Sequence, residues 1–400
     1  MKKTIYDIYY VWISELKVVF RDPAVILLFF IVPLMYPLVY SFFYNNEVVS
    51  EVKVVVVDNS HSAIARDFIR KMDASHDVKI VGYVADMEEA KEAMHRKEAY
   101  GIVMIPEDFS RNIYTQQQTQ VNVYVDMSSM LFYKAIFLTA TEVALNIGAD
   151  IRVSEMGYKT KTEDDATMQA VENEWVSFYN PMNGFASFLI PAILILIIQQ
   201  TMFLGIATIV GTHNDRKRFS EASHAQEGKM INAISLTVGK AFCYATIYLI
   251  VCAWVLRVVP YLFKFPQIGD PLTIAVFLMP FLLASTFFCM TLSYFCSQRE
   301  FAMPLFAFTS VLFVFLSGVS WPWIAMPGPL KAIAYIIPST PGINGFVKIN
   351  TMGATLPDVW IEYIALSVQA LVYCITAIFM YKWWIRNYDP LYRGMVRNKK

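Results

Sequence analysis

The sequence predicts an α-helical integral membrane protein with six transmembrane helices and an α/β domain inserted after the first helix. Apolar stretches long enough to cross a bilayer as a helix recur along the chain, and one long polar segment separates the first from the second. The composition agrees, because 56% of the residues are hydrophobic and only 16% are charged. A soluble protein carries about 25% charged residues.

The chain before the first apolar stretch predicts an interfacial amphipathic helix over residues 1–22. Apolar residues from Ile5 to Val19 recur at helical spacing, and lysine and arginine residues flank them. Asp22-Pro23 ends this helix, because proline is tolerated at the start of a helix and not inside it. An ordinary solvent-exposed helix is the alternative.

Each long apolar stretch has to be helical in lipid, because a backbone amide there has no water partner. Residues 23–44 form the first predicted span. It is longer than the apolar core of a signal peptide, and bulky residues stand at its end where a cleavage site needs small ones, so we expect it to stay uncleaved. The other five lie within residues 181–384. The six stretches are Ala24–Tyr44, Phe185–Thr212, Ser235–Leu262, Leu272–Cys296, Phe301–Trp321 and Trp360–Trp384.

Residues 322–338 are apolar, but prolines interrupt them and they are too short to span a bilayer. This pattern predicts a re-entrant hairpin before the sixth span, since non-helical backbone inside a membrane needs cover from protein. An interfacial loop is the alternative.

Residues 45–180 predict an extracytoplasmic α/β domain, because β-branched runs alternate with segments of helical spacing. This insert contains no cysteine, so disulfide bonds do not hold it together. The predicted strands are Val52–Val57, Val78–Val84, Tyr100–Ile105 and Val121–Asp126, and the predicted helices are Ser62–Ala74, Asp86–Glu98 and Ser129–Glu155.

The distribution of basic residues predicts that both termini are cytoplasmic. Lysine and arginine occur in the N-terminal segment, in the loop after the second span and in the tail at 385–400. The positive-inside rule places these short segments in the cytoplasm and the insert on the other side.

Several function classes are disfavoured by what the sequence lacks. It contains no P-loop motif, no G-x-S-x-G and no H-E-x-x-H, so an integral enzyme is disfavoured and no catalytic, cofactor-binding or metal residue is assigned. The zero net charge gives no general attraction to nucleic acid. Lys240 and Arg257 lie near the ends of the third span, where long side chains can reach the interface. The middles of spans two to five hold no Asp or Glu, which disfavours a proton-coupled transporter.

Seven short motifs follow one another in order along nearly the whole chain. They are Arg21-Asp22-Pro23 with Pro33 and Pro37, Val54–Ser60, Tyr100–Ser110, Tyr179-Asn180-Pro181, Leu189-Ile190-Pro191, Gly239-Lys240, and Leu316-Ser317-Gly318 with Pro322, Met326-Pro327 and Ile337-Pro338. In this order they resemble the membrane permease of ABC type-2 exporters, the variety with a large outer domain after helix one. The loop after the second span departs from the family pattern, because His213–Phe219 stands where the family has an Arg-Glu-rich segment.

The resemblance implies a permease subunit that forms the translocation path of an ATP-driven exporter in the bacterial inner membrane. It implies that the chain binds no cofactor itself and uses ATP through a separate ABC ATPase subunit. The other implied partners are membrane lipids and a second permease copy or a sister permease. A periplasmic adaptor is a further candidate partner. The alternative from another class is a non-transporting sensor or scaffold that displays its outer domain and needs no ATPase.

The resemblance also suggests site residues. The loop at 212–229 is the predicted ATPase-coupling segment, and a solvated basic anchor set by topology is the alternative. Its charged candidates are Arg216, Lys217, Arg218, Glu221 and Glu227. A second coupling position is the N-terminal helix around Glu15 and Lys17. Gln199 and Gln200 in the second span are candidates for the translocation path, with helix–helix hydrogen bonding as the alternative.

Overall fold

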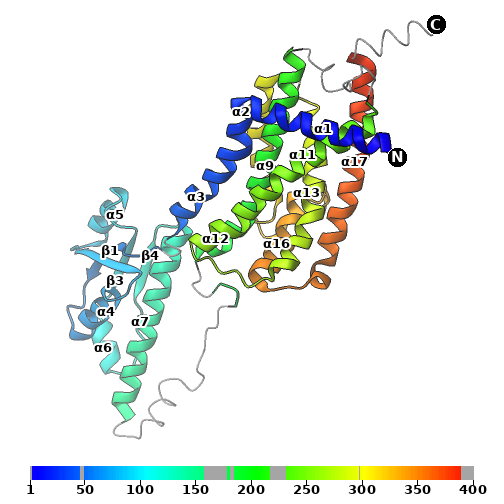
Figure 1. Cartoon of the computed structure of the whole chain (residues 1–400). Helices are drawn as coiled ribbons and strands as arrows, with labels where there is room; N and C mark the ends of the chain where they lie inside the picture. Colours follow the sequence, from blue (N-terminus) through cyan, green and yellow to red (C-terminus); the bar gives the residue numbers. More distant parts are fainter. Residues whose placement is uncertain are drawn as a thin grey trace. The chain divides into compact units, whose positions relative to one another are not determined.

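The computed structural model describes residues 2–45, 49–156, 178–180, 184–216, 231–296 and 298–388. The chain forms two compact units (Figure 1). The helical unit comprises Met1–Asn45 and Phe178–Lys400, and the inserted unit comprises Asn46–Ser177.

A four-stranded sheet forms the middle of the inserted unit, in the order β2-β1-β3-β4. The strands are β1 (Val52–Asp58), β2 (Val78–Tyr83), β3 (Gly101–Ile105) and β4 (Asn122–Val125). Strand β1 pairs in parallel with β2 and β3, and β3 pairs antiparallel with β4. All four strands agree with the sequence prediction.

Helices cover both faces of this sheet. They are α4 (Ala63–Asp73), α5 (Met87–His95), the short α6 (Phe109–Tyr114) and α7 (Met130–Met156). Val54 and Val56 of β1 pack with α4 and α7, whereas Val55 and Val57 pack with α5. Successive strand residues point to opposite faces, so the valine run fills both cores. The sequence analysis assigned α4, α5 and α7 correctly and missed α6.

The helical unit starts with α1 (Lys2–Arg21), and the first span consists of α2 (Pro23–Ile26), the π-helical η1 (Leu27–Ile31) and α3 (Val32–Tyr44). The following helices are α9 (Phe185–Arg216), α11 (Ala233–Ala253) with the π-helical η2 (Trp254–Val258) and α12 (Val259–Leu262), and α13 (Pro271–Ser293). The last spans are α14 (Ala302–Leu316), which follows the 3-10 turn η3 (Arg299–Phe301), and α17 (Trp360–Tyr388), which follows η5 (Leu356–Val359).

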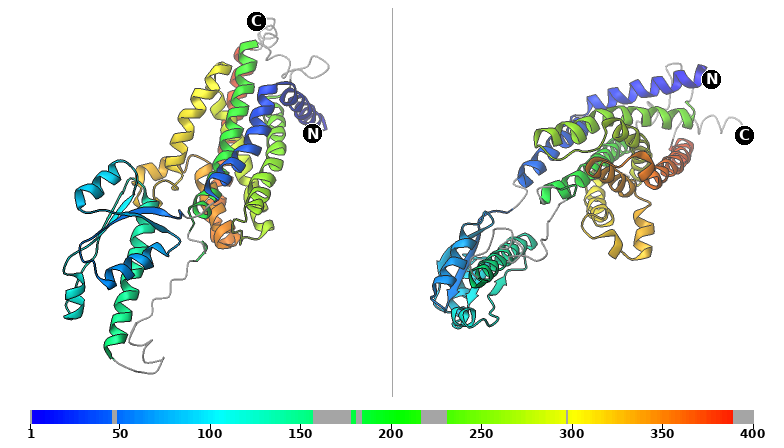
Figure 2. Two further views of the ribbon diagram at one scale, coloured as in Figure 1. Left: turned by 90° about the vertical axis from the view of Figure 1, so that its left-hand side faces the viewer. Right: turned by 90° about the horizontal axis from the view of Figure 1, so that it is seen from below.

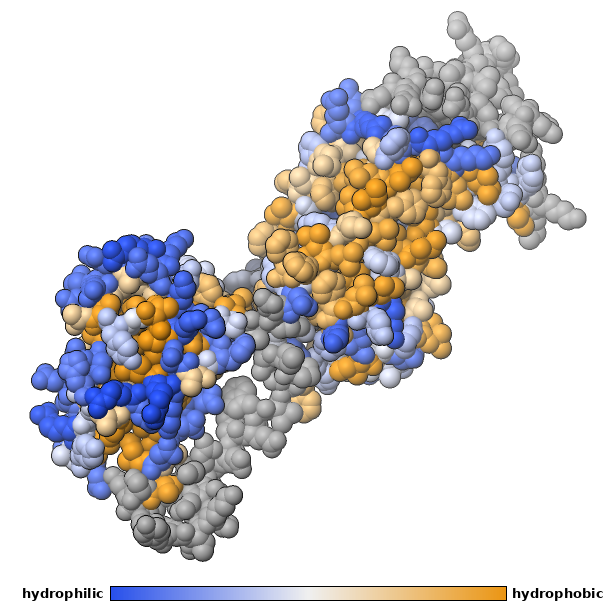
Figure 3. Space-filling model, turned by 60° about the vertical axis from the view of Figure 1, so that its left-hand side comes forward, coloured by the Kyte–Doolittle hydropathy of each residue, from blue (hydrophilic) through white to orange (hydrophobic). Residues whose placement is uncertain are grey.

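Helix α9 is the central helix of this unit (Figures 1 and 2). In its most apolar stretch of 18 residues, 89% of the residues are buried, compared with 22% in the fifth span and 17% in the last. Hydrophobic residues form a broad band on the surface of the helical unit, between more hydrophilic ends (Figure 3). Such a band is the surface that a bilayer requires, because only apolar side chains tolerate contact with lipid tails.

All six predicted spans lie in helices that are long and apolar enough to cross a membrane, and α7 is a seventh such helix among the described residues. Helix α7 packs on the sheet of the inserted unit through Ile136, Val143 and Ile147. This packing accounts for part of its apolar character, so we retain six spans as the prediction.

Several predicted boundaries differ from the structure, among them the ends of α9, α13 and α14. Helix α13 ends at Ser293, before the predicted Cys296. Helix α14 ends at Leu316 and not at Trp321, because Gly318 adopts a φ of +84°, in the left-handed region that favours glycine and ends the helix. Helix α9 continues through Arg216, so the first residues of the predicted loop at 212–229 are helical.

The segment between α14 and α17 is helical in short pieces. It contains η4 (Trp323–Ala325), α15 (Gly328–Ala334) and the almost completely buried α16 (Ser339–Met352). The sequence analysis did not predict α16, which has a proline in its first turn and two glycines. A proline at a helix start is tolerated, and packing against α9 and α13 overrides the low helix propensity of the glycines. The re-entrant path of 322–338 stays a prediction.

Candidate functional site

The N-terminal helix α1 runs beside α11 (Figure 2), and a buried ion pair joins the two helices. The Lys240 ammonium lies 3.1 Å from the Glu15 carboxylate, and the two side chains are 5% and 2% exposed. The Tyr244 hydroxyl donates a hydrogen bond to the same carboxylate. The Lys240 ammonium also lies 5.8 Å from the centre of the Tyr381 ring, on α17. Three helices therefore share this buried charge.

The sequence of both helices brings these charges together. Val11, Glu15 and Val19 are four residues apart and form the buried stripe of α1. Gly239 lets α1 come close, because a Cβ atom at this position would lie 2.7 Å from the Val11 Cβ and 2.9 Å from the Ile8 carbonyl oxygen. The interfacial position of Lys240 stays a prediction; the structure shows that its side chain is buried against α1, and that its partner comes from a helix more than 200 residues earlier in the chain.

The Glu15 carboxyl is charged in this setting. Burial by itself raises its pKa, but the charges of Lys240 and His213 and the hydrogen bond from Tyr244 outweigh burial and hold the pKa below its ordinary value. Removing one member of a buried ion pair typically costs about 3–5 kcal/mol, because the other charge is left without compensation. The Glu15–Lys240 pair thus fixes α1 on α11.

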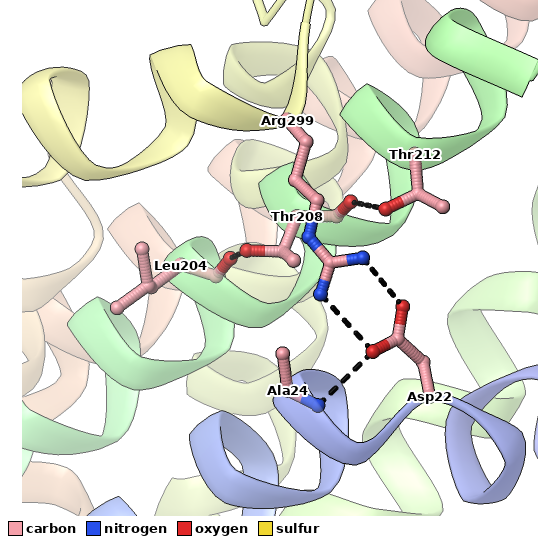
Figure 4. A network of polar contacts seen from close by, with 6 residues as sticks. All are labelled: Asp22, Ala24, Leu204, Thr208, Thr212 and Arg299. Atoms are coloured by element: carbon pink, nitrogen blue, oxygen red, sulfur yellow. Dashed lines mark hydrogen bonds and ion pairs between the residues drawn. The ribbon is translucent and has the colours of Figure 1, made fainter.

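A second ion pair joins the start of the first span to the turn before α14. Both terminal guanidinium nitrogens of Arg299 donate to the Asp22 carboxylate, at 3.0 and 3.1 Å (Figure 4). Asp22 also caps α2 by accepting a hydrogen bond from the Ala24 backbone N–H. Burial alone raises the pKa of Asp22, but these hydrogen bonds hold it below its ordinary value. The side chains of Asp22 and Arg299 are 17% and 34% exposed.

Helix α9 forms the base of this second contact. A Cβ atom on Gly211 would lie 2.6 Å from the Arg299 Cα, so the absence of a side chain at Gly211 allows the turn η3 to rest on α9. The hydroxyls of Thr208 and Thr212 donate back to carbonyls of their own helix, those of Leu204 and Thr208 (Figure 4). The Asp22–Arg299 pair therefore lies against the last turns of α9.

The predicted coupling residues lie at the end of α9 or beyond it. Arg216 is the last residue of this helix. Lys217, Arg218, Glu221 and Glu227 lie outside the described residues. The structure does place the two helices that flank this segment: α11 carries Lys240, and α9 packs through Gly211 against the turn η3 that carries Arg299.

The predicted path residues lie inside the helical unit. Gln199 is fully buried, and its side-chain oxygen accepts a 3.5 Å hydrogen bond from Ser285 of α13. Gln200 is 6% exposed, and neither polar atom of its side chain has a hydrogen-bond partner among the described residues. Next to them, the Tyr248 hydroxyl donates to Thr201 at 3.1 Å. The first glutamine thus connects α9 to α13, as in the alternative interpretation, and a path along these residues stays a prediction.

The sequence singled out Asp22 as the end of the first helix and Lys240 as a charge near the end of the third span, but it did not predict their partners. A signal for Glu15 was present, because a carboxylate on the apolar stripe of an amphipathic helix needs a buried partner. Arg299 gave no comparable signal, since it follows an apolar stretch as any flanking charge does. Within the described residues, no group of three or more His, Cys, Asp or Glu side chains is placed to hold a metal ion.

Comparison with known families gives one match. The profile described as ABC-2 family transporter protein matches residues 23–379. Among curated proteins, none matches the chain. The matched range begins one residue after Asp22, so it includes Lys240 and Arg299 but not their partners Glu15 and Asp22.

Proposed function

Because this chain belongs to the ABC-2 transporter family, and is thus a permease subunit of an ABC transporter, we propose that it exports its substrate with energy from a separate ATPase subunit. Two permease copies, or this chain and a sister permease, pair with two ATPase subunits in this proposal. Both termini and the segment after α9 are cytoplasmic, and residues 46–177 are on the outer side of a bacterial inner membrane. The absence of a P-loop motif from these 400 residues supports a separate source of ATP hydrolysis.

The observation that best supports coupling is the way α1 is attached. The segment 217–230 connects α9 to α11, and these two helices contact η3 and α1, respectively. A partner that binds this segment and α1 can therefore shift α1 and α11 together. Nucleotide binding that draws two ATPase subunits together would rock these helices and alternate access to a path between the permeases.

Co-purification tests this proposal. The tagged chain is purified from its native membranes, and an ABC ATPase is identified by mass spectrometry and by ATP hydrolysis. Replacing Arg216, Lys217, Arg218, Glu221 and Glu227 together with glutamine should leave membrane levels normal and reduce the retained ATPase. Close charge pairs at a partly buried interface contribute about 1–3 kcal/mol each, so the loss should be at least tenfold.

A matched control removes three lysines from the inserted unit. Lys53, Lys79 and Lys91 are exposed, and their change to glutamine should not alter ATPase retention, because surface ion pairs contribute little. Full retention in the loop variant would move the contact to the exposed side of α1, where Lys17 lies, because Glu15 is buried in its pair with Lys240. Absence of any ATPase from the wild-type preparation would contradict the proposal.

A further inference from the structure

The two ion pairs that hold the N-terminal region differ in how easily they can separate. The Glu15 and Lys240 side chains are almost completely buried, so separation would leave two charges without water or a counter-charge. The Asp22 and Arg299 side chains are 17% and 34% exposed, so water can hydrate both groups when they part. The first contact is therefore permanent on the time scale of a folded protein, and the second can open.

The helices on the two sides of the Asp22–Arg299 pair also differ in how firmly they are held. Helix α1 packs along α11, with Gly239 in contact with Val11. Only 22% of residues 299–316, which comprise η3 and α14, are buried. The N-terminal end of α14 is held where η3 rests on Gly211 of α9 and where Arg299 reaches Asp22. Release of this pair would remove one of the contacts that hold the start of α14 and would not disturb α1 and α11. The packing of η3 on Gly211 and the hydrogen bond that the Asn214 side chain of α9 donates to the Cys296 carbonyl oxygen would then hold this segment alone.

We propose that the Asp22–Arg299 pair is a reversible latch, which is closed in this structure and opens during the transport cycle to release the cytoplasmic end of α14. Helix α1 stays fixed to α11 throughout. The inference rests on the proposed function, because ATPase binding at the end of α9 provides the force that lifts Arg299 away from Asp22. Asp22 and Arg299 are positioning residues in this scheme.

Hydrogen–deuterium exchange on the purified permease in nanodiscs tests the latch. Asp22→Asn keeps an N-cap acceptor for Ala24 and removes the charge, because asparagine caps helices as well as aspartate does. Asp270→Asn is the matched control. Asp270 also caps a helix that begins with proline, and it has no ion pair within the described chain. We expect roughly tenfold faster exchange at 299–303 in Asp22→Asn, unchanged exchange at 11–19 and 236–244, and neither change in Asp270→Asn.

The second measurement uses the wild-type complex with its ATPase, nucleotide-free and trapped with ATP and vanadate. Trapping should raise exchange at 299–303 and leave 11–19 and 236–244 protected, and a folded but merely structural pair would show no such rise. Equal protection of 299–303 in both states would overturn the latch, as would loosening of α1 in Asp22→Asn. If no ATPase associates, the proposed function fails and the opening step fails with it. Separate release of α14 is still decided by the permease alone.

Discussion

Single residues determine how the N-terminal helix is attached. Glu15 lies on the apolar stripe of α1, where sequence reasoning expects a hydrophobic residue, and its buried position is understandable only with Lys240 and Tyr244 beside it. Hydrophobic spacing can be read from a sequence because it is local. The pairing of two charges from distant segments depends on how the helices pack, and no local pattern encodes it.

Replacing Glu15 or Lys240 alone should destabilise the protein strongly, whereas replacing both with apolar residues should destabilise it much less. Glu15→Gln and Lys240→Met should each lower the free energy of unfolding by about 3–5 kcal/mol, because each leaves an unpaired buried charge. The double variant Glu15→Leu with Lys240→Met should lose much less than the sum, since apolar side chains can replace the pair. Unfolding by sodium dodecyl sulfate, monitored by circular dichroism, measures these values.

Lys17 provides the control for this series, because it lies on the exposed side of α1. Lys17→Gln should change the free energy of unfolding by no more than about 0.5 kcal/mol. Additive losses in the double variant would show that Glu15 and Lys240 do not interact energetically, and the attachment of α1 would then rest on its apolar contacts.

At the scale of elements, the sequence predicted the regular parts of the fold and missed the parts that packing decides. The six apolar stretches and the four strands follow from hydrophobic period and β-branched runs. Helix α16 was missed because proline and glycine lower its intrinsic helix propensity, whereas burial between α9 and α13 stabilises it. The ends of α9 and α14 also differ from the predicted ones. Hydropathy shows where the chain becomes polar, and this point need not coincide with the last helical residue.

Close approach of α1 to α11 predicts that Gly239 does not accept a side chain. Gly239→Ala should lower the free energy of unfolding by about 1–3 kcal/mol, because the added methyl group would press against Val11 and the Ile8 carbonyl. Gly148→Ala in α7 is the control, since nothing lies within 4 Å of its added Cβ and alanine favours a helix by about 0.5–1 kcal/mol. The same denaturant titration measures both.

Val11→Ala should rescue Gly239→Ala only slightly, because it removes the Val11 Cγ1 atom at 2.8 Å but keeps the Val11 Cβ atom at 2.7 Å and the Ile8 carbonyl oxygen at 2.9 Å. If Gly239→Ala is as well tolerated as Gly148→Ala, the two helices are less closely packed in the membrane than in this structure. The buried ion pair would then have room to admit water.

For the whole molecule, the arrangement in the membrane follows from two independent features. Residues of the helical unit form an apolar band between polar ends (Figure 3), and the short basic segments predict which end is cytoplasmic. The chain divides into two compact units, one of them Asn46–Ser177, and the domain boundaries read from the change in polarity near residues 45 and 180 stay a prediction. The charged loop after α9 was predicted from composition alone, and its partner on another chain cannot be deduced from one sequence.

The orientation predicts which engineered cysteines react in intact cells. His76 is an exposed residue of the inserted unit, and Ser223 lies in the basic loop. In a variant without the five native cysteines, a membrane-impermeant maleimide should label His76→Cys in intact cells, and Ser223→Cys only after permeabilisation. The reason is that lysine and arginine in short loops are retained in the cytoplasm during insertion, whereas a long polar domain is translocated regardless of its charge. Labelling of Ser223→Cys but not His76→Cys in intact cells would reverse the topology. It would also remove the segment between α9 and α11 from the reach of a cytoplasmic ATPase, so this experiment decides whether the coupling scheme is geometrically possible.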